Sequence, residues 1–193
     1  MSQDLAGASQ VRRLPERIHL TMKKTGWVNF VWDLAGDELS AVTMPRQYRL
    51  SLVKAAEREQ LQGVIEKSFA LDPGWNAALH MIEAQVKSSI AAAFDSESAN
   101  WLALQHGARI VGGTLLLMTD PDAPAQLVPG PCILMEYRNR GLGTLLLCSA
   151  LRHLRDAGMI RACAKTRENS PAARFLYPKF GGQSSLIEPL LAA

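Results

Sequence analysis

A short run of arginine and glycine between an apolar strand and a long apolar helix most constrains how this chain can fold. We predict the strand at residues 132–137, followed by a turn and an amphipathic helix at 142–156. Such a turn directs the free backbone N–H groups of the helix start, with the positive end of the helix dipole, at one point. That point suits an anion, most often a phosphate. Gly141 and Gly143 let a ligand approach the backbone closely, because neither has a Cβ atom.

Two common nucleotide-binding patterns do not fit this turn. The dinucleotide fingerprint has a third glycine where this chain has Leu146, and the Gly-Lys-Ser/Thr of a P-loop is absent. A tight strand-to-helix turn without a ligand is the alternative to an anion site. Arg138 and Arg140 add positive charge beside the turn and favour the anion site.

The rest of the chain predicts strands and helices that alternate along one sheet. Residues 119–131, rich in Pro, Asp and Gly, are expected to form a loop. Further strands are predicted at 48–53, 101–105, 109–118, 159–166 and 184–191, and further helices at 54–70, 75–90 and 171–177. This order indicates an α/β (α+β) mixture built on a single sheet.

Residues 1–46 have a different character and are interpreted as an N-terminal extension of a domain at 47–193. Two β-like runs, 18–22 and 27–32, flank a polar spacer that contains Gly26, which predicts a β-hairpin. Five basic side chains lie between residues 12 and 24. Such a run is more typical of a solvated face than of nucleic-acid binding.

Composition excludes several classes of protein. The 193 residues are 48% hydrophobic and 20% charged, with a net charge of +3, which excludes a disordered chain and gives little support to a nucleic-acid partner. The longest apolar runs fall short of the ~20 residues that span a bilayer. The sequence starts without a signal-peptide pattern, so a cytoplasmic location is expected. Cys132, Cys148 and Cys163 lack a CxxC spacing, which predicts packed thiols and no metal site.

A second stretch of sequence, 166–182, changes the interpretation of the turn. Residues 138–143, RNRGLG, fit the pattern Arg/Gln-x-x-Gly-x-Gly/Ala. Ser170, Ala173, Tyr177 and Gly181 fit Asn/Ser-x-x-Ala-x-x-x-Tyr-x-x-x-Gly in register. Together the two stretches resemble the GNAT superfamily of acyl-CoA-dependent N-acetyltransferases, and the resemblance covers residues 47–193.

The resemblance implies a centrally splayed mixed sheet flanked by helices, acetyl-CoA as co-substrate and an amine as acceptor. The strand at 133–135 would bind the pantetheine through main-chain groups and would splay from 162–166. The cofactor-binding residues so implied are Ile133, Leu134, Met135, Arg138, Asn139, Arg140, Gly141, Leu142, Gly143, Thr144, Asn169 and Ser170.

The resemblance also implies that Tyr177 is the general acid, which protonates the departing CoA thiolate. A phenol of pKa ~10 is a reasonable donor to a thiolate of pKa ~8.5 or above. Packing on the short helix is the alternative role of this ring. No general base is assigned. The candidates are Glu136, Asp120, Asp122, Glu188, His106 and His80.

This chain departs from the family pattern in three places. Met135 stands where many members have proline, Gly182 replaces an aromatic residue, and we expect the sheet to be one strand short of the family pattern after 184–191. The predicted hairpin at 18–32 would cover the open sheet edge that results. An incomplete edge also invites pairing, so a homodimer is expected. A non-catalytic acyl-CoA-binding or regulatory module of the same fold is the alternative to an enzyme.

Overall fold

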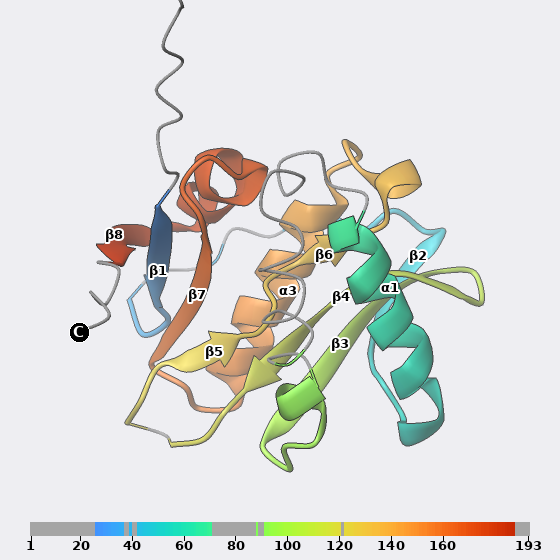
Figure 1. Cartoon of the computed structure of the whole chain (residues 1–193), viewed down its shortest axis with the longest axis horizontal. Coiled ribbons are helices and arrows are strands. Elements are labelled where there is room, and N and C mark those ends of the chain that lie inside the picture. Colours follow the sequence, from blue (N-terminus) through green and yellow to red (C-terminus); the bar gives the residue numbers. More distant parts are fainter. Residues whose placement is uncertain are drawn as a thin grey trace, which may run out of the picture.

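The computed structural model describes residues 26–36, 39, 42–70, 88, 91–120 and 122–187. Eight strands form one mixed sheet at its centre, in the order β2-β3-β4-β5-β7-β1-β8, and β6 pairs with β4 (Figure 1). The strands are β1 (Trp27–Asp33), β2 (Tyr48–Leu52), β3 (Ala99–His106), β4 (Arg109–Leu117), β5 (Ala125–Leu127), β6 (Cys132–Ile133), β7 (Arg161–Arg167) and β8 (Gln183–Ile187). The helices are α1 (Arg58–Ala70) and α3 (Leu142–Asp156), with short helical turns η1 (Ala55–Glu57), η3 (Met135–Tyr137), η4 (Ala172–Leu176) and η5 (Tyr177–Phe180).

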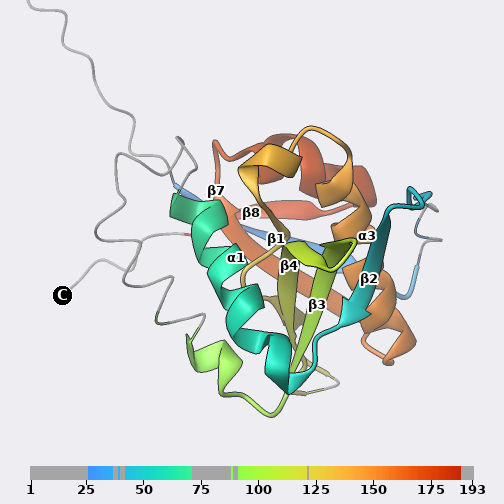
Figure 2. The ribbon, with the colours of Figure 1, turned by 90° about the vertical axis from the view of Figure 1, so that its right-hand side faces the viewer.

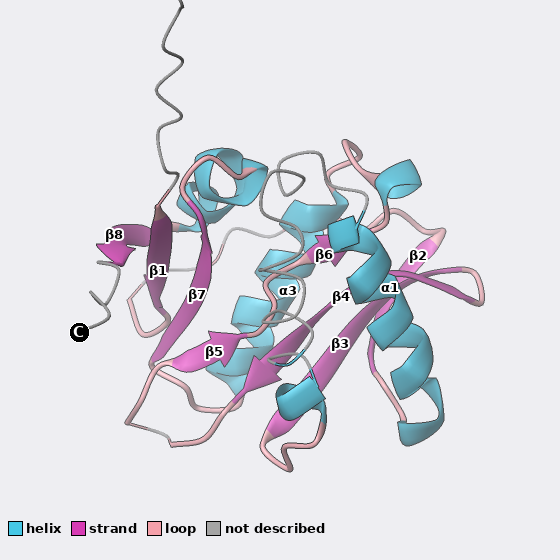
Figure 3. Cartoon of the chain, viewed as in Figure 1, coloured by secondary structure: helices cyan, strands magenta, loops and turns pink. Residues whose placement is uncertain are grey.

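The sheet consists of two antiparallel parts joined by one parallel pair. β2, β3, β4 and β5 pair antiparallel in succession, and so do β7, β1 and β8. β5 and β7 are parallel, and α3 lies in the connection between them, as a parallel crossover requires. The mixed sheet flanked by helices confirms the predicted fold class (Figure 3).

Helices cover the sheet from opposite sides (Figures 1 and 2). α3 packs with Leu102 and Leu104 of β3 in one hydrophobic cluster, and α1 packs with Trp101 and Ala103 in the other. Successive strand residues point to opposite faces, so the near-continuous apolar run of β3 supplies both clusters. The helix predicted at 142–156 has these bounds in the structure and buries eight side chains.

The N-terminal strand corrects one expectation. Residues 18–22, the first half of the predicted hairpin, lie outside the described residues, as does most of the helix predicted at 75–90. β1 does not cover an edge of the sheet. It lies between β7 and β8 and pairs with both, so that Trp27 faces Arg167 on one side and Ile187 on the other. Its alternate side chains Val28, Phe30 and Trp32 are buried, as an internal strand requires.

Two further predictions are wrong in detail. The strand predicted at 132–137 is only two residues long, because the chain turns into η3 at Met135. The predicted loop 119–131 contains β5, whose Ala125 and Leu127 are buried between β4 and β7. Proline and aspartate around these three residues conceal the strand in the sequence.

The described residues include neither a membrane-spanning helix nor a metal-binding cluster. They contain no helix with the length and hydropathy to cross a bilayer. Within the same ranges, no group of three or more His, Cys, Asp or Glu side chains is arranged to hold a metal ion.

Candidate functional site

The sheet opens at its centre, between β6 and β7. β7 pairs with β5 through Ala162–Ala164, whereas Lys165–Arg167 extend beyond the last β5 partner, Leu127. After β5 the chain continues to β6, which pairs with β4. The predicted splay of 133–135 away from 162–166 is therefore present, and it lies beyond Ala164, where the pairing of β7 with β5 ends.

Gly112 of β4 allows β6 to approach closely. A Cβ atom on Gly112 would lie 2.5 Å from Ile133 Cδ1 and 2.6 Å from the Cys132 carbonyl oxygen. The Leu134 amide donates to the Val111 carbonyl at 3.0 Å, and Ile133 pairs with Gly112. In antiparallel geometry the main-chain groups of Ile133 therefore point away from β4, toward the opening beside β7.

The turn at residues 138–144, called the anion turn below, has the backbone of an anion-binding nest. Asn139 and Gly141 both have positive φ, 61° and 76°. The first backbone hydrogen bond of α3 runs from the Leu145 amide to the Gly141 carbonyl at 3.0 Å. The amides of residues 142–144 thus precede the helical hydrogen-bond ladder, and they point out of its positive end.

The space beside the anion turn is open. A Cβ atom on Gly141 would meet nothing within 4 Å, and one on Gly143 would meet only Leu176 Cδ2, at 3.7 Å. The first turn of α3, which is wholly described, has no acidic side chain and no side-chain cap. Unused amides, open space and a first helical turn without a carboxylate fit an anionic group such as a phosphate.

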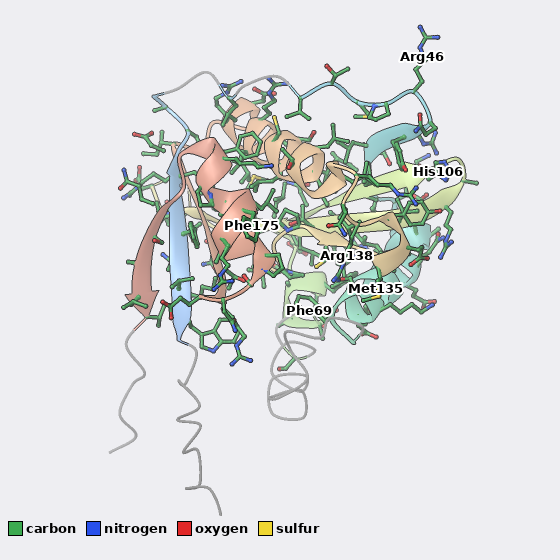
Figure 4. All side chains as sticks on the ribbon, turned by 90° about the horizontal axis from the view of Figure 1, so that it is seen from above. Arg46, Phe69, His106, Met135, Arg138 and Phe175 are labelled. Atoms are coloured by element: carbon green, nitrogen blue, oxygen red, sulfur yellow. The ribbon has the colours of Figure 1, made fainter. Side chains whose placement is uncertain are left out.

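The two arginines of the anion turn hold its backbone in place. Arg138 Nε donates to the Ile133 carbonyl at 3.0 Å and Nη2 donates to the Ser68 carbonyl at 2.6 Å, which ties the turn to the end of α1. Figure 4 shows Arg138 beside Phe69 and Met135 on this side of the molecule. Arg140 Nη2 donates to the Glu136 carbonyl at 3.0 Å. Their charge lies beside the turn, and these bonds also shape it.

The candidate bases have other visible roles or lie outside the described residues. Glu136 forms an exposed ion pair with Arg109 at 2.9 Å, and its pKa is lowered by a backbone hydrogen bond and by Arg109. Asp120 accepts from the Asp122 amide at 2.9 Å in an exposed turn. His106 is exposed at the end of β3, with its ring 5.7 Å from that of Tyr137. Two candidates lie outside the described residues, Glu188 and His80.

Tyr177 is buried at the opening of the sheet, with 2% of its surface exposed. Its ring lies edge-on to those of Phe30 and Trp32, with centroids 5.1 Å away in both cases. Its hydroxyl reaches the backbone of Gly130, between β5 and β6, where a Cβ atom would overlap it. Burial raises the pKa of Tyr177 above its usual value, with a smaller contribution from Cys132, so the phenol is neutral at physiological pH.

The serine of the second motif stabilises the turn that follows β7. The Ser170 hydroxyl accepts from the Ala173 amide at 3.1 Å and lies 2.9 Å from the Thr166 hydroxyl. Asn169 is exposed beside it. The structure thus brings Ser170 and Ala173 together through a hydrogen bond at the start of η4, and Ala173 lies four residues before Tyr177.

Four residues of this region carry no signal of a functional role in the sequence: Phe30, Trp32, Gly112 and Gly130. The apolar alternation of β1 indicated a strand but gave no information about its partners. The glycines have no side-chain signal, and their importance appears only when the neighbouring atoms are known. Cys132, predicted as a packed thiol, is buried, and burial raises its pKa to about 12.

Solved structures of other proteins share the fold of this chain. No curated protein sequence matches the chain. A GCN5-related N-acetyltransferase from Sphaerobacter thermophilus has a similar structure, with 18% identity, a TM-score of 0.58, and 84% of this chain and 49% of that chain covered. A GCN5-related N-acetyltransferase from Kribbella flavida is also similar, with 12% identity and a TM-score of 0.55. The match covers 86% of this chain and 56% of that chain. This chain therefore spans about half the length of either.

A third similar structure is the ribosomal-protein-S18-alanine N-acetyltransferase from Escherichia coli, with 15% identity, a TM-score of 0.51, and coverage of 69% and 76%. Identities this low establish a shared fold only. The model of the acetyltransferase (GNAT) family matches residues 56–181, more than half of the 193 residues, and that range contains the anion turn and Tyr177. The chain belongs to the acetyltransferase (GNAT) family.

Proposed function

We propose that this protein transfers an acetyl group from acetyl-CoA to a primary amine. The observation that carries the proposal is the anion turn, with three amides outside the helical ladder and open space at Gly141 and Gly143. The amides of residues 140–144 would bind the pyrophosphate of acetyl-CoA, which supplies the activated acyl group. Asn139 would support this site by holding the left-handed backbone conformation that turns the amides toward one point.

The main chain at 133–135 would bind the pantetheine arm as if it were an added strand. Support comes from the direction of the Ile133 main-chain groups, which point away from β4. The Ile133 carbonyl already accepts from Arg138 and retains a second lone pair. Asn169 and Ser170, after the unpaired end of β7, would lie on the opposite side of the arm.

Tyr177 would be the general acid. The amine nitrogen forms a bond to the thioester carbon, the carbon–sulfur bond breaks, and the Tyr177 proton passes to the sulfur as negative charge develops on it. The amine loses its own proton to solvent or to a base, and Tyr177 is reprotonated before the next turnover. Burial raises the pKa of Tyr177, so the phenol holds its proton before each transfer and regains it readily afterwards, although the same shift makes it a weaker acid toward the sulfur.

A second candidate function, an acyl-CoA-binding module without catalysis, is favoured by the burial of the Tyr177 side chain. Burial of the phenol is equally compatible with a ring that only stabilises the fold and takes no part in catalysis. Both functions require binding of acyl-CoA, but only the enzyme transfers the acyl group to an amine.

One experiment separates them. Calorimetric titration of the full chain with acetyl-CoA measures binding, and release of the free CoA thiol in the presence of a panel of amines measures transfer. For the enzyme we expect binding and amine-dependent release. In Tyr177→Phe, kcat should fall about 100-fold or more at unchanged acetyl-CoA affinity. Binding without release for every amine would support the binding module, and absence of binding would contradict both.

A further inference from the structure

Two aromatic rings packed against Tyr177 come from outside the region that defines the family. The family model matches residues 56–181, whereas the two rings packed against Tyr177, Phe30 and Trp32, belong to β1. Both rings meet the phenol at steep angles, 69° and 86°, which is the preferred edge-to-face arrangement.

Trp32 also holds the main chain of Tyr177. Its indole Nε1 donates to the Tyr177 carbonyl at 3.3 Å. Tyr177 begins η5, so this bond fixes the point where η4 ends and η5 begins. Trp32 is 1% exposed, and a buried carbonyl that lost its donor would have no water to replace it.

Gly182 makes this bond geometrically feasible. A Cβ atom at this position would lie 2.7 Å from Trp32 Nε1 and 2.8 Å from the Tyr177 carbonyl oxygen, in the path of the hydrogen bond. The glycine that departs from the family pattern thus lies directly against the tryptophan that β1 introduces. The two features belong to one arrangement.

Trp32 itself has little freedom to move. β1 pairs with β7 along its whole length and with β8 from Trp27 to Val31. Tyr177 packs against Trp32 on one side, and its hydroxyl lies against Gly130, where the sheet opens. The phenol is therefore held between a fixed strand and the backbone at the opening.

We propose that Trp32 is a positioning residue for acyl transfer, which holds Tyr177 so that its hydroxyl faces the opening beside Gly130. The inference rests on the proposed role of Tyr177 as general acid. It assigns to β1, outside the family match, an indirect part in the reaction. Trp32 acts through Tyr177 alone, and binding of acetyl-CoA at the anion turn does not depend on it.

The test is a double-mutant cycle in the full chain with Trp32→Phe and Tyr177→Phe. Trp32→Phe keeps an aromatic ring and removes the N–H donor. We expect it to lower kcat at least about tenfold, with acetyl-CoA affinity within about twofold of wild type, because small misplacement of a reacting group slows the reaction steeply. In the Tyr177→Phe background the same substitution should change kcat by less than about twofold.

Trp101→Phe is the matched control. Trp101 is a second buried tryptophan, in the α1 cluster, and its Nε1 has no hydrogen-bond partner among the described residues. Its loss should leave kcat within about threefold, since no hydrogen bond is broken. If Trp32→Phe does not fold, Gly182→Ala displaces the same indole while leaving Trp32 present, and the same loss of kcat at constant affinity is expected.

Each outcome decides the proposal. Loss of kcat that disappears in the Tyr177→Phe background supports it. Equal loss in both backgrounds, or no loss in Trp32→Phe, overturns it while leaving the general acid intact. Wild-type kcat in Tyr177→Phe alone overturns the general acid, and the positioning role with it.

Discussion

The anion turn and the surroundings of Tyr177 are assembled in different ways. The turn comes from one stretch of seven residues and presents backbone amides to open space. Tyr177 is enclosed by β1, by Gly130 and by Gly182, which are separated by up to about 150 residues in sequence. A site of the first kind can be altered without disturbing the core, whereas any change at the second also changes the packing. The following experiments test that contrast, from the largest expected effect to the smallest.

Gly143→Asp should strongly weaken acyl-CoA binding and leave the fold unchanged. A side chain at Gly143 meets only Leu176 at an ordinary distance, and a carboxylate at a helix start stabilises the helix by up to ~1 kcal/mol. The same carboxylate repels a pyrophosphate, so acetyl-CoA affinity should fall more than about 100-fold, which corresponds to ~2.7 kcal/mol. Calorimetry and urea unfolding measure the two effects.

Gly63→Asp provides the control for this change. Gly63 lies on α1, where an added Cβ would meet nothing within 4 Å. Wild-type affinity is expected. Unchanged affinity in Gly143→Asp would contradict the placement of the anion site, and global unfolding of that variant would contradict the separation of the turn from the core.

Gly112→Ala should lower the free energy of unfolding, in contrast to Gly143→Asp, whose main effect is on acetyl-CoA affinity. The added methyl would overlap Ile133 and the Cys132 carbonyl, so β6 must move away from β4. Such overpacking costs roughly 1–3 kcal/mol. Urea unfolding measures the loss, and Gly63→Ala, which adds a methyl group to an open helix position, should be neutral or stabilising by up to ~1 kcal/mol. Unaltered stability of Gly112→Ala would show that β6 is not tightly packed.

The pH dependence of stability should reveal the burial of Cys132. In the folded protein its thiol stays protonated up to about pH 12, whereas in the unfolded chain it ionises above the ordinary pKa of 9.0. The unfolded state therefore binds fewer protons between these values. The free energy of unfolding should fall there by ~1.4 kcal/mol per pH unit from this group. Cys132→Ser cannot ionise, so its decline should be shallower by that amount, and equal slopes would contradict the burial.

The smallest effect is expected at Glu136, beside the anion turn. Its carboxylate is exposed and paired with Arg109, and only its main-chain carbonyl supports the turn, through Arg140. Glu136→Gln should keep kcat within about twofold of wild type, because loss of a true general base costs about 100-fold or more. A large fall in kcat in steady-state assays would reassign this residue as the base.

Features that depend on residues close together in the chain are predictable from the sequence. The bounds of α3 follow from its apolar periodicity, and the anion turn follows from Gly141 and Gly143 at the helix start. The hairpin of β3 and β4 follows from two apolar runs around His106 and Gly107. The sequence alone predicts a loop where β5 lies, a longer strand than β6 and an edge position for β1, because strand pairing across the sheet decides these three features.

The sequence by itself therefore determined the fold class, the anion turn and the positions of Ser170 and Tyr177, because each depends on spacing within a few turns of chain. Only the tertiary structure decided that β1 lies between β7 and β8, and that Trp32, Gly130 and Gly182 meet at Tyr177. The physical reason is that alternation along a strand specifies which side chains are buried, whereas the choice of partner depends on shape and hydrogen bonding across the sheet. The structural role of a glycine can be recognised only when the atoms that a Cβ would contact are known.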